Sequence, residues 1–200
     1  RTWMVCETVF EGCALNVTVL EIRDSLKRQR NEVLLFCPAT ERKKASLESW
    51  DVCFVPTIDF LGLKVKYAVY QLSLIISMGW QCLKHRPDCI YSRPLLAMVS
   101  PVLMARLMRV PQFLHLSGDP LEQLTTAGSS RLLRSMYAVV ERVNCRLSSR
   151  VIVETQRNKL TYQKRHGLPP YKVIHIPNGV NTSLFKPMDM RNARKEIGID

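Results

Sequence analysis

The sequence predicts an α/β fold with a doubly wound, mostly parallel, Rossmann-like sheet of about seven strands. Two observations predict it. Short apolar, β-branched runs alternate with longer segments of helical periodicity along the whole chain. The runs contain almost no charged residues, as expected for strands buried on both faces of a parallel sheet. A chain of 200 residues, 46% of them hydrophobic, can bury a sizeable core without disulfides or metals.

Residues 3–55 are predicted to form three strands, with a helix between the first two. The apolar runs at 3–9, 33–37 and 52–55 are the expected strands. Between the first two, apolar residues recur four, three and four positions apart, which predicts a helix whose apolar side is Leu15, Val19, Ile22 and Leu26. We expect Asn31 to take the left-handed turn after this helix. Residues 40–49 are polar and basic and are predicted as a loop.

Residues 67–83 form a run without a charged side chain. The run is at the short end of what can cross a bilayer, and it contains the polar residues Gln71, Ser73, Ser77 and Gln81. We therefore predict an amphipathic helix, with a membrane span as the alternative. The side expected to pack on the sheet consists of Val65, Val69, Leu72, Ile76 and Leu83.

The second half continues the same alternation. Strands are expected at 89–91 and 113–116, a buried helix at 95–107 and a loop at 121–130. The helix predicted at 131–147 has two chemically different sides. Four arginines fall within one third of its circumference: Arg131, Arg134, Arg142 and Arg146. The opposite side is apolar and contains Leu132, Leu133, Met136, Val139, Val140, Val143 and Leu147.

These two sides lead to a prediction about partners. We expect the apolar side to pack on the sheet and the four arginines to face outward, where they would bind an anionic membrane surface. A solvated face, or a contact with another domain, is the alternative. The formal net charge of +12 also favours acidic partners, although a generally basic surface would give the same value.

The segment 150–187 is predicted to form a βαβ unit. Strands at 151–153 and 173–176 flank a helix that Gly167 and two prolines end, and Pro177-Asn178-Gly179 turns the chain after the second strand. In open α/β sheets, ligands bind beyond the carboxyl ends of the strands. Glu154, Thr155, Asn178 and Gly179 would then lie on the functional edge.

The cysteines and the N-terminal residues indicate in which cellular compartment the protein is expected. The seven cysteines are an odd number, scattered without a C-x-x-C pair, which argues against a zinc site and favours reduced, cytosolic thiols. No secretory signal precedes the first strand. We expect a cytoplasmic protein, with a peripheral position at the cytoplasmic face of a membrane if the arginines dock. Because the sequence starts at Arg1, we expect a processed chain or a fragment.

Residues 150–187 resemble the end of the N-terminal domain in family 4 retaining glycosyltransferases. That family continues from its last strand into I-P-N-G-V-D, and this chain reads Ile176-Pro177-Asn178-Gly179-Val180-Asn181. Segment 87–93 is similar to the family's P-D-V-I-H-x-H, and segment 110–118 to its V-P strand that ends in H-G. Segment 193–199 resembles the opening of the family's second domain.

The resemblance implies the N-terminal half of a GT-B architecture, with two Rossmann-like domains that face a cleft. Residues 1–180 would be the acceptor-side domain, and 181–200 the linker and the start of a truncated, donor-binding C-terminal domain. The implied reaction transfers a sugar, of the hexosyl type, from a nucleotide-sugar to a glycan or lipid-linked acceptor with retention of configuration. No metal or other cofactor is implied. The fragment alone is expected to be inactive.

The resemblance also suggests which residues meet the substrates. The family's active-site histidine aligns with Ser117, and His115 projects from the same strand face, so we expect these two at the catalytic centre. The expected donor or acceptor contacts are Gly12, Cys13, Asn16, Ser92, Arg93, Gly118, Asp119, Thr155, Arg157, Asn178 and Gly179. Where the family usually has two adjacent glycines, this chain has Cys13-Ala14. The alternatives are a loop glycine without a ligand, a histidine satisfied within the domain and an arginine in solvent.

Two other functions remain as alternatives. A non-catalytic, transferase-like binding domain fits the altered glycine loop and Ser117. A basic α/β module that binds nucleic acid would fit the net charge, but no reading motif is present, and we do not expect a nucleic-acid partner. Neither the G-x-G-x-x-G of dinucleotide-binding domains nor the G-K-[ST] of P-loops occurs.

Overall fold

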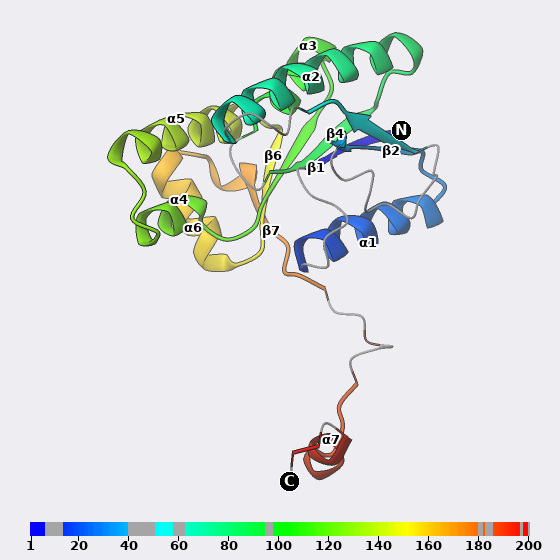
Figure 1. Cartoon of the computed structure of the whole chain (residues 1–200), viewed down its shortest axis with the longest axis vertical. Coiled ribbons are helices and arrows are strands. Elements are labelled where there is room, and N and C mark those ends of the chain that lie inside the picture. Colours follow the sequence, from blue (N-terminus) through cyan, green and yellow to red (C-terminus); the bar gives the residue numbers. More distant parts are fainter. Residues whose placement is uncertain are drawn as a thin grey trace.

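The sheet has seven strands, all parallel, in the order β3-β2-β1-β4-β5-β6-β7 (Figure 1). The computed structural model describes residues 1–6, 14–39, 51–57, 63–94, 98–179, 182, 186–196 and 198–199, with the side chains of 14–17 and 63–66 left out. The strands are β1 (Thr2–Cys6), β2 (Val33–Pro38), β3 (Val52–Val55), β4 (Cys89–Arg93), β5 (Gln112–Leu116), β6 (Arg150–Val153) and β7 (Val173–His175). This confirms the predicted fold class.

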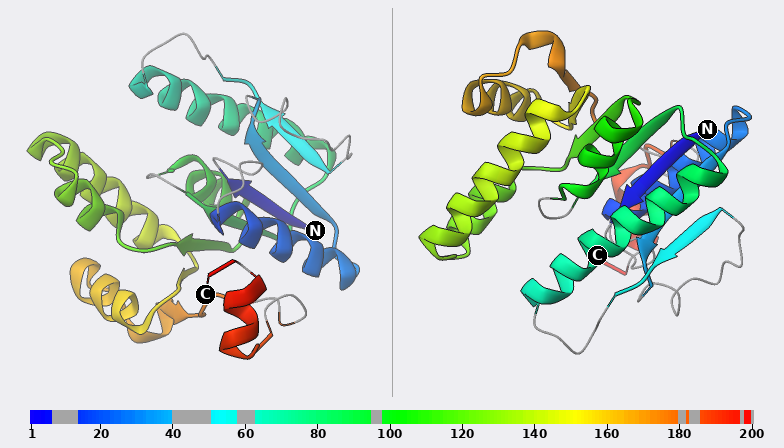
Figure 2. Two further views of the ribbon diagram at one scale, coloured as in Figure 1. Left: turned by 60° about the horizontal axis from the view of Figure 1, so that its bottom comes forward. Right: turned by 90° about the horizontal axis from the view of Figure 1, so that it is seen from above.

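Helices cover both faces of the sheet (Figures 1 and 2). They are α1 (Ala14–Arg28), α2 (Leu63–Lys84), α3 (Ser100–Met108), α4 (Pro120–Thr126), α5 (Arg131–Leu147), α6 (Gln156–His166) and α7 (Met190–Glu196), with a 3₁₀ turn at Pro170–Lys172. α1 packs on one face, which we call the α1 face, and α2 and α3 pack on the other. The strand order reverses between β1 and β4, which is the point where α/β sheets of this kind bind their ligands.

Apolar strand residues fill the core on each face. On the α2 side, Trp3 and Phe36 lie with their ring centroids 5.2 Å apart, and both contribute to the same buried cluster as α2 and α3. On the α1 face, Met4 and Leu35 pack with Val19 of α1. A further cluster joins β5, β6 and β7 to α5 and α6. Alternate residues of each strand point to opposite faces, so the strands are apolar throughout, as predicted.

Helix α2 packs on the sheet through a different side from the one predicted. Tyr70, Leu74 and Met78 are its buried residues, spaced four apart, and the Tyr70 hydroxyl donates to the Cys6 carbonyl at 3.2 Å. The predicted sheet-facing residues Leu72, Ile76 and Leu83 are exposed instead. Both sides of the helix are apolar, so periodicity alone could not decide which one is buried. Within the described part of the chain, no helix is long and apolar enough to span a membrane.

The prediction for α5 is likewise wrong about its buried side. The residues it turns inward are Tyr137, Glu141, Asn144 and Cys145, and most of its apolar side lies in solvent. The reason is an ionic network with α6. Glu141 accepts from the His166 ring at 2.7 Å and lies 3.4 Å from the Arg165 guanidinium, so a paired carboxylate takes the place expected for leucines.

Two local predictions also need correction. The predicted loop at 121–130 contains helix α4, which Asp119 starts by accepting from the Glu122 amide at 3.2 Å. Thr125 and Thr126 bond back to the backbone inside it. After α1, Arg30 rather than Asn31 takes the left-handed conformation (φ 62°). The Asn31 side chain instead donates to the Leu26 carbonyl, which closes the helix end.

After β7, the Ile176 amide still donates to the Val153 carbonyl at 3.0 Å. Figure 1 shows α7, which follows later in the chain, apart from the sheet. The predicted boundary between a domain at 1–180 and a linker with the start of a second domain at 181–200 falls between β7 and α7 in the sequence and stays a prediction. The predicted loop at 40–49 lies outside the described residues.

Candidate functional site

Polar side chains gather on the α1 face at the carboxyl ends of β4, β5 and β6. Tyr91 and Arg93 come from β4 and His115 from β5, while Ser117 and Glu154 follow β5 and β6 directly. Side chains two residues apart on a strand point to the same face, so these five positions lie on one side of the sheet. The site is therefore built from three neighbouring strands, at the edge where the sequence predicted it.

Arg93, Ser117 and Glu154 form one hydrogen-bonded group. The Arg93 Nη2 atom donates to Glu154 Oε1 at 2.7 Å, and its Nε atom donates to Ser117 Oγ at 3.0 Å. The Ser117 hydroxyl donates to the same Glu154 oxygen at 3.0 Å. The guanidinium is almost fully buried, and such a charge is tolerated because a carboxylate pairs with it. Its third nitrogen, Nη1, is buried and has no partner.

His115 is held as a neutral ring. Burial, together with the positive charge of Arg93, lowers the pKa of His115 to about 3. Its Nδ1 atom lies 2.5 Å from the Tyr91 hydroxyl. Burial raises the pKa of Tyr91, so that hydroxyl stays protonated and donates a hydrogen bond to Nδ1. The hydrogen of the ring is then on Nε2, which lies 3.5 Å from Glu154 Oε1 and has no hydrogen-bond partner.

This geometry decides what the group can do chemically. Arg93 Nη2 and the Ser117 hydroxyl donate to Glu154, which is the acceptor of the group, and the His115 Nε2 atom is a further donor 3.5 Å from it. A neutral histidine whose Nδ1 already accepts from Tyr91 cannot take up a proton easily. His115 is therefore suited to hydrogen-bond donation rather than to general-base catalysis.

His115 also lines a pocket of about 580 Å³ between α1 and segment 176–179. The predicted site residues Asn178 and Gly179 line the same pocket. Its wall on the α1 side carries Glu21, Asp24 and Arg28. The structure thus brings three of the predicted contacts together, from strand β5 and from the turn that follows β7.

Other predicted site residues have structural roles in this fold. Asp119 caps α4 and forms an ion pair with Arg165, whose side chain helps to lower the pKa of that carboxyl although burial raises it. Thr155 caps α6 by accepting from the Asn158 amide at 3.1 Å. Helix caps of this kind contribute about 1 kcal/mol to stability, which accounts for both residues without a ligand.

Gly118 and Ser92 are also engaged within the domain. Gly118 has a positive φ of 75°, and its carbonyl accepts from the Tyr162 hydroxyl at 3.3 Å. Ser92 lies on the face opposite to the site, where it is buried and accepts from Gln112. The Arg157 side chain is 83% exposed, and its nearest described acid is Glu122 at 3.8 Å.

The predicted loop around Gly12 and Cys13 falls in a part of the chain that the structure does not describe. Asn16 falls in the first turn of α1 with its side chain also outside the described residues. In the described part of the chain, no three His, Cys, Asp or Glu side chains are grouped so that they could hold a metal ion.

Tyr91 is absent from the predicted site residues, and Glu154 was predicted on the functional edge but not among the expected donor or acceptor contacts. The signal for Glu154 was present, because it is the first residue after a β-branched run at the expected functional edge. Thr155 and Arg157 have chemistry that suggests ligand binding, but Thr155 caps α6 and the Arg157 side chain is largely exposed to solvent. Tyr91 stands inside a strand, where its sequence context does not distinguish it from a core aromatic residue.

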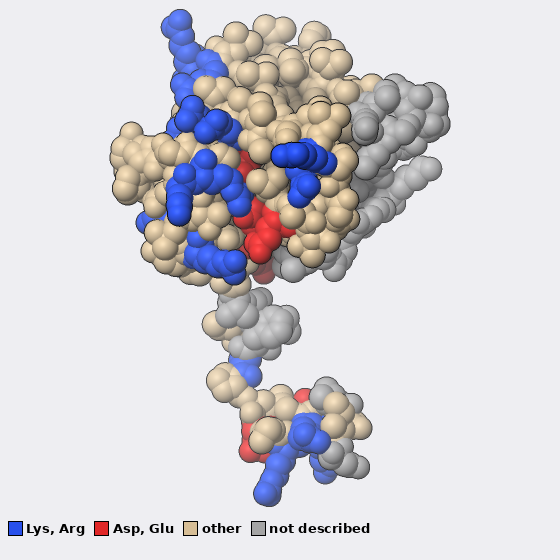
Figure 3. Space-filling view, turned by 90° about the vertical axis from the view of Figure 1, so that its left-hand side faces the viewer, with Lys and Arg blue, Asp and Glu red and all other residues tan. Residues whose placement is uncertain are grey.

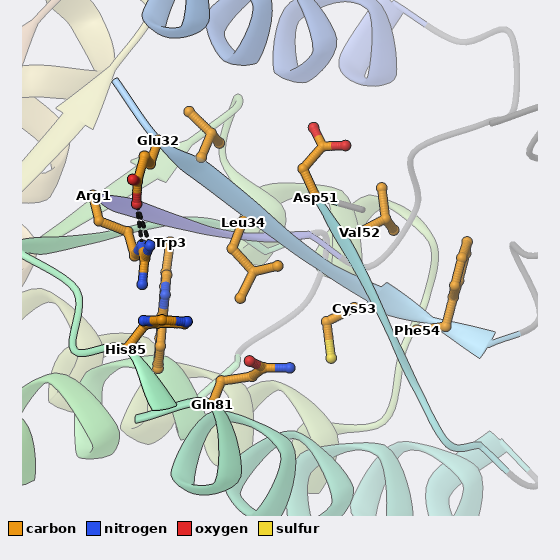
Figure 4. A pocket seen from close by; sticks show the side chains of 11 residues that line it. Arg1, Trp3, Glu32, Leu34, Asp51, Val52, Cys53, Phe54, Gln81 and His85 are labelled. Carbon is orange, nitrogen blue, oxygen red and sulfur yellow. Dashed lines mark hydrogen bonds and ion pairs between the residues drawn. The ribbon is translucent and has the colours of Figure 1, made fainter. Parts of the chain in front are cut away.

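A second pocket, of about 510 Å³, lies at the amino ends of β1, β2 and β3, opposite to the site (Figure 4). Trp3, Cys53, Gln81 and His85 line it. Figure 4 shows the Arg1 side chain at its rim, paired with Glu32. Burial raises the pKa of Cys53, which keeps that thiol protonated and unreactive. Nothing in this pocket matches the donor group around Glu154.

Comparison with known proteins identifies the family. The sequence profile of Glycosyltransferase Family 4 matches residues 15–184. The chain belongs to this family. No curated protein matches it. The seven-stranded sheet is the Rossmann-like domain expected for a family 4 member with the GT-B fold, and the chain corresponds to the N-terminal domain of that fold.

Solved structures share this fold at low sequence identity. Sucrose-phosphate synthase from Thermosynechococcus elongatus matches with a TM-score of 0.72 and 13% identity, over 100% of this chain and 53% of its own. WaaG, a glycosyltransferase involved in lipopolysaccharide biosynthesis, matches at 0.66 and 13%, over 100% and 52%. Anabaena HepE, solved with UDP and glucose, matches at 0.56 and 16%, over 98% and 50%. This family 4 domain thus spans about half the length of each.

Proposed function

We propose that this family 4 domain is the acceptor-binding half of an enzyme that transfers a sugar from a nucleotide-sugar to a glycan or a lipid-linked acceptor. The observation that carries the proposal is the hydrogen-bonded group around Glu154, whose member His115 also lines a pocket of about 580 Å³. The structure of HepE with UDP and glucose supports a nucleotide-sugar donor. The role of WaaG in lipopolysaccharide biosynthesis supports a lipid-linked acceptor.

Each member of the group has a role in this proposal. Glu154 accepts a hydrogen bond from a hydroxyl of the acceptor and so orients it toward the donor sugar. Arg93 and His115 surround the Glu154 carboxylate with preorganised donors and fix its position for the reaction. Ser117 bridges Arg93 and Glu154 by hydrogen bonds and so keeps both side chains in position. Arg157, exposed at the start of α6, meets an anionic acceptor in place of its long contact with Glu122.

The chemistry of the whole enzyme follows the family in this proposal. The sugar, of the hexosyl type, is transferred with retention of configuration. Groups of the second domain stabilise the departing diphosphate, and no metal or other cofactor takes part. The cleft between the two domains excludes water, which strengthens the hydrogen bonds of the group around Glu154.

The test is turnover of a nucleotide-sugar by the full-length protein carrying Glu154→Gln. The substitution keeps the shape but removes the charge that orients the acceptor, and we expect a loss of roughly 100-fold in kcat. Glu32→Gln is the matched control, because Glu32 lies exposed beside Arg1 at the amino ends of the strands, opposite to the group, and should leave kcat unchanged. Equal activities of the two variants, with normal folding, would remove Glu154 from the mechanism.

A non-catalytic, transferase-like domain is the second candidate. Ser117, in the place of the family's histidine, favours it, since its hydroxyl is fully used between Arg93 and Glu154. Isothermal titration of the full-length protein with UDP-sugars separates the two candidates. Binding without any turnover, across a range of acceptors, supports the non-catalytic one.

A further inference from the structure

The outer side of α2 is a continuous apolar stripe in solvent. Leu72, Ile76, Trp80 and Leu83 follow one another four, four and three residues apart, which places them along one line on the helix. Their exposed fractions range from 62% to 82%. The opposite side of the same helix fills the core, so packing within the domain does not account for this stripe.

Helix α5 carries a second stripe of the same kind. Leu132, Met136, Val139 and Val143 are four, three and four residues apart and between 36% and 72% exposed. They stay in solvent because the inward side of α5 is committed to Glu141 and its ionic partners on α6. The exposed stripe therefore follows from a polar contact beneath the helix, and not from a shortage of apolar residues in the core.

Helix α3 lies between the two stripes. It packs against both α2 and α5, and it turns Leu103 and Leu107 outward. Figure 2 shows α2, α3 and α5 spread across one face of the molecule. We call the outer surface of these three helices the apolar face. Contiguous exposed apolar surface of this extent marks an interaction site rather than ordinary surface.

The charges around the apolar face have one sign. α2, α3 and α5 contain a single acidic residue, Glu141, and it is buried. Exposed basic residues lie on the same helices and their ends: Lys84, Arg106, Arg109, Arg131, Arg142 and Arg146. Figure 3, which views the domain from the side of α4, α5 and α6, shows Lys and Arg spread over this side of the domain and its visible acids gathered in one patch, with other acids near α7.

We propose that the apolar face docks on an anionic lipid bilayer, with α2 lying in the plane of the membrane. Apolar side chains on an interfacial helix enter the boundary between headgroups and acyl chains, while basic side chains at its edges meet the phosphates. Trp80 is of the residue type that prefers this boundary, and Lys84 lies over its ring at 5.5 Å. This docking does not require the proposed transferase activity.

Charge decides between a bilayer and a protein as the occupant. The rim of a protein interface is polar and usually carries charges of both signs, whereas these three helices expose no acid at all. A second copy of the chain would bring arginines against arginines around the same face. An anionic bilayer matches both the apolar stripes and the surrounding positive charge.

Sedimentation of the full-length protein with vesicles tests the proposal. We expect it to pellet with vesicles of phosphatidylcholine and phosphatidylglycerol, much less with phosphatidylcholine alone, and less as salt is added. The triple substitution Leu72→Gln, Ile76→Gln and Leu83→Gln should weaken the binding by about tenfold or more. Leu160→Gln is the control, because Leu160 is exposed on α6, outside the apolar face.

Two further measurements test whether the apolar face itself contacts the membrane. The emission of Trp80 should shift to shorter wavelength on anionic vesicles, and Trp80→Phe should abolish that shift while binding persists. If the triple variant unfolds, Met136→Gln with Val139→Gln on α5 makes the same test. The proposal is overturned if anionic vesicles do not bind, if the variants bind equally well, or if the same substitutions abolish a dimer seen in sedimentation velocity.

Discussion

At the scale of single residues, His115 should make the stability of the folded protein depend on pH. Above pH 6.5, the ordinary pKa of the group, the ring is neutral in both the folded and the unfolded chain. Below it, the unfolded chain takes up a proton that the folded protein does not bind until about pH 3. The free energy of unfolding should therefore fall on acidification, by about 1.4 kcal/mol per pH unit from this residue.

Urea unfolding at a series of pH values, compared with His115→Asn, measures this dependence. The asparagine carbonyl still accepts from Tyr91 but does not titrate, so the difference between the two proteins isolates the ring. We expect the stability of the variant to fall less steeply than that of the natural protein just below pH 6.5. Parallel curves for the two proteins would show that His115 is protonated in the folded state.

At the scale of the elements, the contact between α5 and α6 depends on one buried carboxylate. Glu141 is buried, and its partner His166 is buried as well. Glu141→Leu would leave the His166 ring and the Arg165 guanidinium without this acceptor, at a cost of about 3 kcal/mol. Replacing both partners, as in Glu141→Leu with His166→Leu, should restore part of that loss. Chemical denaturation of the three proteins measures it, and a double variant no more stable than the single one would argue against a desolvation cost.

The same elements show how far the sequence predicts this fold. Each strand expected from the apolar runs is present, because a buried parallel strand needs a local apolar run and little else. The buried sides of α2 and α5 were predicted wrongly for two different reasons. α2 is apolar on both sides, so its periodicity does not select one. In α5 the buried side is polar, and Glu141 becomes acceptable there only through partners on α6.

The candidate site was predicted in place but not in detail. The edge of the sheet, His115 and Arg93 follow from strand positions and from the family resemblance. That Asp119 and Thr155 are helix caps could not be predicted, because a cap and a ligand-binding residue have the same chemistry and differ only in the amide they face. The ion pair of Arg93 with Glu154 joins residues 61 positions apart and needs the strand order to be known.

At the scale of the whole molecule, the chain holds one of the two domains of the GT-B fold. We expect residues 1–200 alone to fold but to transfer no sugar, because the groups proposed to stabilise the diphosphate belong to the other domain. Incubation of the purified chain with nucleotide-sugar and acceptor, followed by product detection, checks this. Product clearly above that of a control without protein would mean that the described domain holds the complete catalytic centre.

The position of β1 has a consequence for how the protein folds. β1 leaves the ribosome before the other strands of this sheet and stands near its middle, where it pairs with both β2 and β4. Thr2 meets Cys89 across 87 residues of chain. Contacts this distant in sequence slow folding, because a long loop must close before they form. Until β4 has been synthesised, one edge of β1 remains open to wrong pairing, so the nascent chain depends on α1 and β2 to hold β1 in place.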